Sequence, residues 1–163
     1  MKIILGADHG GFELKEEIKK YLGDKKIKVA DVGAEKLDKQ DDFVDYAELV
    51  ASEVSGGDGS ASSPQVMGIL FCRNGFGMMI AANRVPGVRC GLGIDEKMVK
   101  AGRNDDDINC LAIPADYLKL DEVKKIVDTY LETKFSGEER FKRRLYKLEM
   151  LGGSCCGGGC GNC

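Results

Sequence analysis

The chain lacks several features that would point to particular classes of protein. No run approaches the roughly 20 consecutive apolar residues that cross a bilayer, and the apolar stretch in the opening MKIILGADHGG is too short for a secretion signal. Positive charge is not in excess, because 24 Lys and Arg face 27 Asp and Glu. These absences argue against a membrane protein and against general nucleic-acid binding. We therefore expect a cytoplasmic protein with no nucleic-acid or membrane partner.

The composition is that of a folded domain. With 163 residues, 43% apolar and 31% charged, the chain has about the length of one domain and enough apolar residues for a core. An enzyme with separate cofactor and substrate domains would need a longer chain. No internal repeat is visible. These properties exclude an intrinsically disordered protein.

Cysteines fall into two groups that need separate explanations. Cys72, Cys90 and Cys110 are spread through the body of the chain, whereas the other four crowd its last nine residues. Residues 152–163 are almost entirely Gly and Cys and cannot bury apolar surface. We predict a domain over residues 1–151 and a disordered, redox-sensitive tail over 152–163. Its thiolates would suffice for one zinc ion or an iron-sulfur cluster, although their spacing matches no known motif: Cys155, Cys156, Cys160 and Cys163.

Short apolar runs alternate with stretches of helical period, which is the pattern of βαβ units in a parallel α/β sheet. The predicted strands are 2–5, 27–31, 66–71, 88–92 and 109–113. Helices are predicted near 11–22, 42–55, 121–134 and 138–151. Residues 56–65, GGDGSASSPQ, are rich in Gly and Ser and predict a flexible surface loop.

In such a sheet ligands bind beyond the carboxyl ends of the strands. The first strand is followed there by Asp8, His9 and two glycines, and His9 is the only histidine of the chain. We expect both side chains to serve the function. The alternative is that Asp8 caps the following helix and His9 only packs or hydrogen-bonds nearby.

The third strand is followed by CRNGFG, which has the form of an anion cradle. Gly75 and Gly77 would let backbone N-H groups point inward at the start of a helix. The positive ends of these N-H groups and of the helix are expected to lower the pKa of Cys72, which would make its thiolate available as a nucleophile or a base. Cys90 and Cys110 lie within predicted strands and are interpreted as core residues. The loop is neither a Walker A loop nor a GxGxxG fingerprint, so nucleotide binding is weakly supported.

These motifs resemble a known family. The segments GADHGGFELKEEIKKYL, CRNGFGMMIAANRVPGVRC and EERFKRRL are similar to the ribose-5-phosphate isomerase B and galactose-6-phosphate isomerase (RpiB/LacA/LacB) family, and the resemblance covers residues 1–151. It implies a Rossmann-like α/β/α sandwich with a five-stranded parallel sheet. It also implies an aldose-ketose isomerase that works through a cis-enediolate without cofactor, as a homodimer or homotetramer with shared active sites.

The resemblance implies a role for each matching residue. Cys72 would be the base that moves a proton between C1 and C2, since a glutamate used by another branch of the family is replaced by Met78. Asp8 would contact a sugar hydroxyl and His9 would lie near the phosphate. Arg140 and Arg144, on one helix face, would bind phosphate in the neighbouring subunit's site. Without the other motifs, these two arginines would be interpreted as a solvated basic face.

The segment GRNDDDINCL departs from the family, which has a ring-opening histidine in HNDANVL. One alignment puts Asp105 at that position, and a two-residue insertion puts Arg103 there, beside Asn104. Either Asp105 or Arg103 would have to act in acid-base or binding work, and Asn104 is expected to bind substrate. The ordinary pKa values of an aspartate and an arginine lie far from neutral pH, unlike that of the imidazole they would replace.

Other departures surround the glycine loop. Arg73 replaces a glycine, and Asn74 replaces a threonine that assists proton transfer between the substrate oxygens. Asp116 stands where an arginine often binds phosphate, and Phe43 where a tyrosine is common. A carboxylate would repel a phosphate, so Asp116 is expected to bind a hydroxyl or to point away.

We therefore expect an isomerase of a small sugar phosphate, with ribose 5-phosphate first and Cys72 and Asn74 in the chemistry. The departures keep other substrates open: a tetrose phosphate, which cannot close a furanose ring, a hexose 6-phosphate, or a deoxy-uronate held by Arg73, Arg140 or Arg144. A non-catalytic sugar-phosphate-binding subunit, and a metal or redox sensor built on the tail, are the competing functions.

Overall fold

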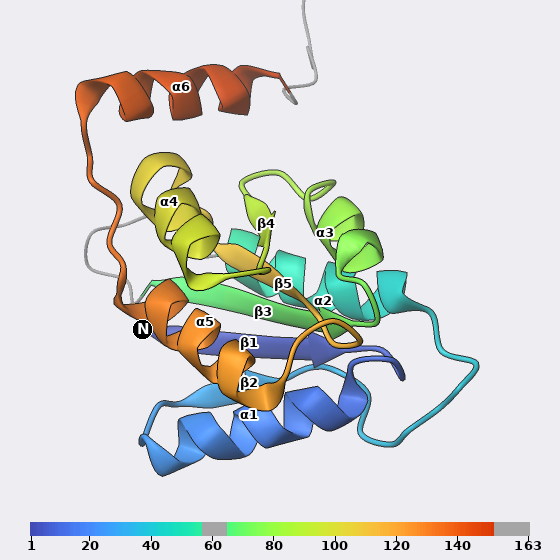
Figure 1. Ribbon diagram of the computed structural model, residues 1–163. Coiled ribbons are helices and arrows are strands. Elements are labelled where there is room, and N and C mark those ends of the chain that lie inside the picture. The colour runs from blue at the N-terminus through green and yellow to red at the C-terminus, as the bar shows by residue number, and fades with distance from the viewer. Residues whose placement is uncertain (57–64, 152–163) are drawn as a thin grey trace, which may run out of the picture.

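The structure, a computed structural model, describes residues 1–56 and 65–151 and is built on one five-stranded sheet (Figure 1). All strand pairs are parallel, in the order β2-β1-β3-β5-β4. The strands are β1 (Lys2–Ala7), β2 (Val29–Asp31), β3 (Val66–Cys72), β4 (Cys90–Leu92) and β5 (Cys110–Pro114). The predicted α/β class with five parallel strands is confirmed.

Helices cover both faces of the sheet and agree closely with the sequence. They are α1 (Phe12–Asp24), α2 (Phe43–Ser55), α3 (Phe76–Ala82), α4 (Glu96–Asp106), α5 (Leu120–Glu132) and α6 (Glu139–Met150). The sequence predicted four of these helices within two residues of their ends and left the bounds of α3 and α4 open. Because α3 has only seven residues, its periodicity is too short to stand out.

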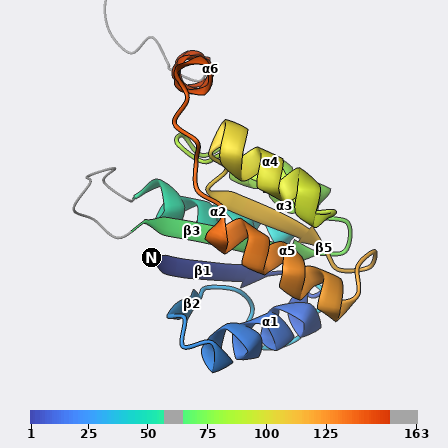
Figure 2. The same ribbon diagram turned by 60° about the vertical axis from the view of Figure 1, so that its left-hand side comes forward.

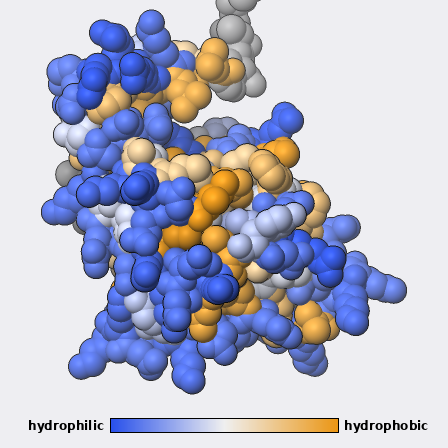
Figure 3. All heavy atoms as spheres, in the orientation of Figure 1, coloured by the Kyte–Doolittle hydropathy of each residue, from blue (hydrophilic) through white to orange (hydrophobic). Residues whose placement is uncertain are grey.

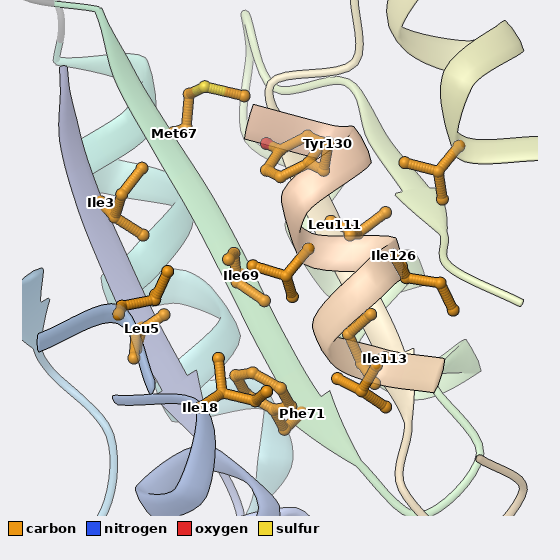
Figure 4. Packing of buried hydrophobic residues seen from close by; sticks show 14 of the residues in the cluster. Ile3, Leu5, Ile18, Met67, Ile69, Phe71, Leu111, Ile113, Ile126 and Tyr130 are labelled. Atoms are coloured by element: carbon orange, nitrogen blue, oxygen red, sulfur yellow. The ribbon is translucent and has the colours of Figure 1, made fainter. Parts of the chain in front are cut away.

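Successive side chains along each strand point to opposite faces of the sheet, so the core has two layers. Ile69 and Phe71 of β3 point toward α1 and α5, where Tyr130 is fully buried (Figure 4). Leu70 and Cys72 point to the other face, which α2 and α3 cover. Cys72 therefore ends its strand on the α2 and α3 side of the sheet.

The loops that follow β1 and β3 touch each other, because glycines allow them to. A Cβ on Gly11 would overlap the backbone of Phe71, and a Cβ on Gly10 would overlap the Arg73 side chain. The two polar loops predicted from the sequence are thereby brought into contact at the carboxyl edge of the sheet.

A buried cation anchors the segment that follows β2. Lys15 of α1 is fully buried, and its Nζ lies 2.5 Å from Asp31 Oδ2 and 2.7 Å from Glu16 Oε1. The same ammonium donates to the backbone oxygen of Ala34 at 3.3 Å. Hydrogen bonds from Lys15 and Lys19 outweigh burial and hold the pKa of Asp31 below its ordinary value.

The last helix, α6, stands out from the rest of the molecule (Figures 1 and 2). Phe141 is its only buried residue, although Leu145 and Leu148 share an apolar face with it. Leu148 is 50% exposed and Met150 is 61% exposed. Hydrophobic surface is visible on the side of α6 turned toward the body and at its carboxyl end (Figure 3). A single chain thus leaves most of this amphipathic helix uncovered.

Two sequence predictions fall outside the described residues. These are the loop of residues 56–65, of which the structure describes only the ends, and the tail of residues 152–163 with its four cysteines. The division into a domain and a tail therefore stays a prediction. Among the helices of residues 1–56 and 65–151, none has the length and apolar character to cross a membrane.

Candidate active site

The loop after β1 is organised by Asp8. Its Oδ1 accepts hydrogen bonds from the backbone N-H groups of Gly10 at 2.9 Å and Gly11 at 3.1 Å, immediately before α1. The capping alternative therefore describes part of what this side chain does. Burial raises the pKa of Asp8 despite these two donors. The carboxyl group is buried and lies close enough to Cys72 for its charge to raise the pKa of that thiol.

His9 is held by a residue that the sequence analysis did not single out. Its Nδ1 lies 2.6 Å from Oδ1 of Asp41, and its backbone N-H donates to the same oxygen at 3.2 Å. The side chain of Asp41 is 6% exposed, and that of His9 is 30% exposed. The imidazole is therefore fixed at one nitrogen and accessible at the other.

Cys72 is 5% exposed at the carboxyl end of β3. The N-H of Gly75 points at its Sγ, 3.2 Å away, and the N-H groups of Met78 and Asn74 also favour the thiolate. Burial nevertheless raises the pKa of the Cys72 thiol, and the nearby Asp8 raises it further. The predicted lowering of this pKa is therefore wrong for the single chain, because desolvation exceeds the effect of the loop donors.

The glycine loop is shaped around the thiol rather than around an open anion cradle. Gly75 has a φ of 77°, a left-handed conformation that glycine adopts without strain, and its N-H is already bonded to Cys72. Oδ1 of Asn74 accepts from the N-H of Phe76 at 3.0 Å, closing the turn. Gly77 leaves room for the ring of Phe43. The sequence predicted that N-H groups around Gly75 and Gly77 point inward as an anion cradle; in the single chain the Gly75 N-H donates to the Cys72 sulfur.

A pocket of about 520 Å³ opens beside these loops. His9 and Gly10 line it together with Arg73 and Asp116, which are joined by a backbone hydrogen bond of 3.0 Å from the Asp116 N-H to the Arg73 oxygen. Among the described residues, the guanidinium of Arg73 has no ion-pair partner within 4.0 Å. The wall is completed by Glu13, Leu37 and Lys39. The pocket therefore combines two cationic side chains, Arg73 and Lys39, with the two carboxylates Glu13 and Asp116, a mixture suited to a polyhydroxylated anion.

Arg103 has a structural role, which corrects the expectation that it binds substrate. It is 3% exposed, and its guanidinium donates to Asp107 Oδ1 at 2.9 Å and to the Ile108 oxygen at 2.6 Å. Asp107 ends α4 in a left-handed conformation and also pairs with Arg89 at 2.8 Å. The two guanidinium groups thus secure the turn into β5.

The remaining predicted residues lie elsewhere in the same chain. Asn104 Nδ2 donates to Asp105 Oδ1 at 2.7 Å at the carboxyl end of α4, which leads to the amino edge of the sheet. The backbone oxygen of Asn104 accepts from the N-H of Ser136, where the chain leads into α6. Arg140 and Arg144 follow on α6, with their guanidinium groups 4.4 and 5.5 Å from the ring of Phe141. One chain therefore does not bring these four residues together with Cys72.

Within the described ranges, no three His, Cys, Asp or Glu side chains gather as a metal site. The sequence analysis did not single out Asp41, which holds His9, nor the pocket residues Glu13, Leu37 and Lys39; all but Glu13 come from the segment between β2 and α2. Nothing in the local sequence KLDKQDDF distinguishes Asp41 from Asp38 or Asp42, because its partner lies 32 residues earlier in the chain.

Comparison with known proteins places the chain in a family. The sequence model of the ribose/galactose isomerase family matches residues 3–148. The chain belongs to this family. It is 36% identical over 141 residues to a probable ribose-5-phosphate isomerase B of Mycoplasma pneumoniae, covering 86% of this chain and 89% of that protein. It is 34% identical over 142 residues to the ribose-5-phosphate isomerase B of Escherichia coli, covering 87% and 91%.

A solved structure gives the same result. Ribose-5-phosphate isomerase B from Mycoplasma genitalium, crystallised with bound ribulose-5-phosphate, superimposes with a TM-score of 0.85 at 35% identity, over 92% of this chain and 95% of that one. The protein is thus an aldose-ketose isomerase of the ribose-5-phosphate isomerase B type. The resemblance stated from the sequence is confirmed.

Proposed function

We propose that this isomerase interconverts ribose 5-phosphate and ribulose 5-phosphate, with Cys72 as the base. The observation that carries the proposal is the Cys72 thiol itself, placed at a strand end with the Gly75 N-H 3.2 Å from its Sγ and with Asp8 nearby. The bound ribulose-5-phosphate of the Mycoplasma genitalium relative supports the choice of substrate.

The proposed reaction moves one proton between two carbons. The Cys72 thiolate takes the proton from C2 of the open-chain aldose, and the C-H electron pair forms the enediolate as the C1 oxygen takes up the charge. The thiol then returns the proton to C1, which leaves a carbonyl at C2 and completes the ketose. In this proposal Asn74 assists proton transfer between the two oxygens, and Asp8 holds a neighbouring hydroxyl.

We infer that the active form is a homodimer or homotetramer with shared sites, and two incomplete halves of a site in one chain support this inference. One half is the carboxyl edge with Cys72 and His9. The other consists of the end of α4, with Asn104 and Asp105, and of α6, with Arg140 and Arg144. The uncovered apolar face of α6 requires a partner surface, and a second copy that received it would gain the two arginines. Positive charge delivered in this way would also favour the Cys72 thiolate.

The experiment is hydrogen exchange in deuterated water, followed by NMR at the carbon beside the carbonyl. Ribose 5-phosphate, erythrose 4-phosphate, allose 6-phosphate, galactose 6-phosphate and a 4-deoxy-uronate are compared. We expect exchange with ribose 5-phosphate, its loss in Cys72→Ala and its retention in Cys90→Ala, which removes another buried thiol. Exchange only with the uronate would assign the substrate to the carboxylate class, with Arg73 as its partner. Ligand-induced thermal stabilisation without exchange would identify a binding subunit instead.

A further inference from the structure

Asp41 and His9 form a hydrogen-bonded pair beside the pocket that His9 lines. Both hydrogen bonds of the Asp41 carboxylate go from His9, one from the ring at 2.6 Å and one from the backbone at 3.2 Å, and both reach Oδ1. The other oxygen, Oδ2, is buried without a partner among the described residues. Asp41 does not cap α2 either, since Asp42 holds the N-cap position. A buried carboxylate with an unpaired oxygen is costly, and the two hydrogen bonds from His9 offset part of that cost.

The pairing determines which ring nitrogen faces the substrate. A carboxylate can only accept a hydrogen bond, so Nδ1 of a neutral His9 must carry the proton and donate it to Asp41. Nε2 then holds a free electron pair. Because His9 lines the 520 Å³ pocket and its side chain is 30% exposed, Nε2 is the ring atom left for a bound sugar. A free electron pair favours contact with a hydroxyl group rather than with a phosphate oxygen.

Opening a furanose ring needs a group that takes a proton near neutral pH. The chain has one histidine, and neither Arg103 nor Asp105, the two residues aligned with the family's ring-opening position, is an imidazole; Arg103 is also buried in its ion pair with Asp107. Tyr46 lies beside Asp41, but burial first and then that carboxylate raise its pKa, so it keeps its proton. His9 is the one imidazole available for the step.

We propose that His9 opens the sugar ring through Nε2 and that Asp41 is its positioning residue. This inference rests on the proposed function. Nε2 takes the proton of the anomeric hydroxyl, whose O-H electron pair becomes the second bond of the C1 carbonyl. The bond between C1 and the ring oxygen breaks with its electrons on that oxygen, which takes a proton from water. The imidazolium, still hydrogen-bonded to Asp41 through Nδ1, later returns its proton to solvent.

The first test needs no activity. In uniformly ¹⁵N-labelled protein, long-range ¹H-¹⁵N correlation reports the tautomer of an imidazole, and a single histidine makes the assignment unambiguous. At a pH where the ring is neutral, we expect Nδ1 to be protonated and Nε2 to be bare. In Asp41→Asn the Nε2-protonated form should gain population, whereas in the control Asp42→Asn it should not. An Nε2-protonated ring in the unaltered protein would overturn the proposal.

The second test separates ring opening from enediolate formation. Ribulose 5-phosphate cannot close a furanose ring because its 5-oxygen is esterified, so exchange of its C1 hydrogens in deuterated water measures the enediolate step alone. For Asp41→Asn we expect turnover of ribose 5-phosphate to fall by at least about tenfold, with C1 exchange of ribulose 5-phosphate changed by less than about threefold. Asp42→Asn should match the unaltered protein in both assays.

An equal loss in both assays, or none in either, would contradict the assignment of ring opening to this pair. Absence of exchange with both sugars in the unaltered protein would refute the proposed substrate, and the tautomer measurement would still decide whether Asp41 orients His9. Failure of the proposal and failure of the proposed function are therefore distinguishable.

Discussion

Removing the carboxylate that pairs with Lys15 should destabilise the protein strongly. The Lys15 side chain is 1% exposed and that of Asp31 is 15% exposed, so Asp31→Asn would leave a buried ammonium with the more exposed Glu16 and one backbone oxygen as partners. Breaking a buried ion pair typically costs about 3 to 5 kcal/mol, and the remaining partners reduce this to about 2 to 3 kcal/mol here. For a chain of this size the melting temperature should fall by about 5 to 10 °C.

The effect should depend on pH in a defined direction. Because the pKa of Asp31 in the folded protein lies below its ordinary value of 3.8, the carboxylate contributes full stability above that value and loses it as pH falls through the folded-state pKa. The free energies of unfolding of the unaltered protein and of Asp31→Asn, measured by denaturant titration, should therefore become equal in acid. Lys19→Met, which removes a 42%-exposed partner of the same carboxylate, should cost less than about 1 kcal/mol. The reasoning would be refuted if Asp31→Asn lowered the free energy of unfolding by less than about 0.5 kcal/mol at neutral pH, or if its effect were as large in acid as at neutral pH.

Three further predictions concern the site and the assembly. Gly75→Ala should destabilise the protein by about 2 kcal/mol in chemical denaturation, because the φ of Gly75 is 77° and a Cβ there would overlap Leu92. The control Gly23→Ala should not destabilise the protein, because a Cβ at Gly23 would have no atom within 4 Å. The raised pKa of Cys72 in the single chain predicts that kcat/KM increases as pH rises above neutrality, unless the partner's arginines offset the burial of the thiol; a plateau already near neutrality would show that they do. Leu148→Lys should weaken self-association in sedimentation experiments without lowering the stability of the single-chain core, because Leu148 is 50% exposed there; unchanged association would exclude α6 from the interface.

The sequence was sufficient to predict the elements of the fold because its signals are local. Apolar runs such as Val66 to Phe71 and the periodicity of α1 and α5 predict strands and helices within two residues of their observed ends. The carboxyl-edge position of Asp8, His9 and Cys72 follows from strand direction alone. These inferences require no knowledge of which side chains meet.

The errors concern contacts and burial. The pKa of Cys72 was predicted to fall because the loop donors are visible in the sequence, whereas the desolvation that outweighs them depends on how α2 and α3 pack. Arg103 pairs with Asp107 only because that residue ends α4 in a left-handed conformation. Asp41 reaches His9 only when the segment after β2 folds back across the site.

The central claim is that each active site combines Cys72 of one chain with Arg140 and Arg144 of another. Co-expression of Cys72→Ala with the double variant Arg140→Ala, Arg144→Ala tests it most directly, since each alone should be inactive in the exchange assay with ribose 5-phosphate. Random pairing would make half of the dimers mixed, each with one intact site of two, so about one quarter of the unaltered activity should return. Activity no higher than the sum of the two separate variants would contradict the shared site.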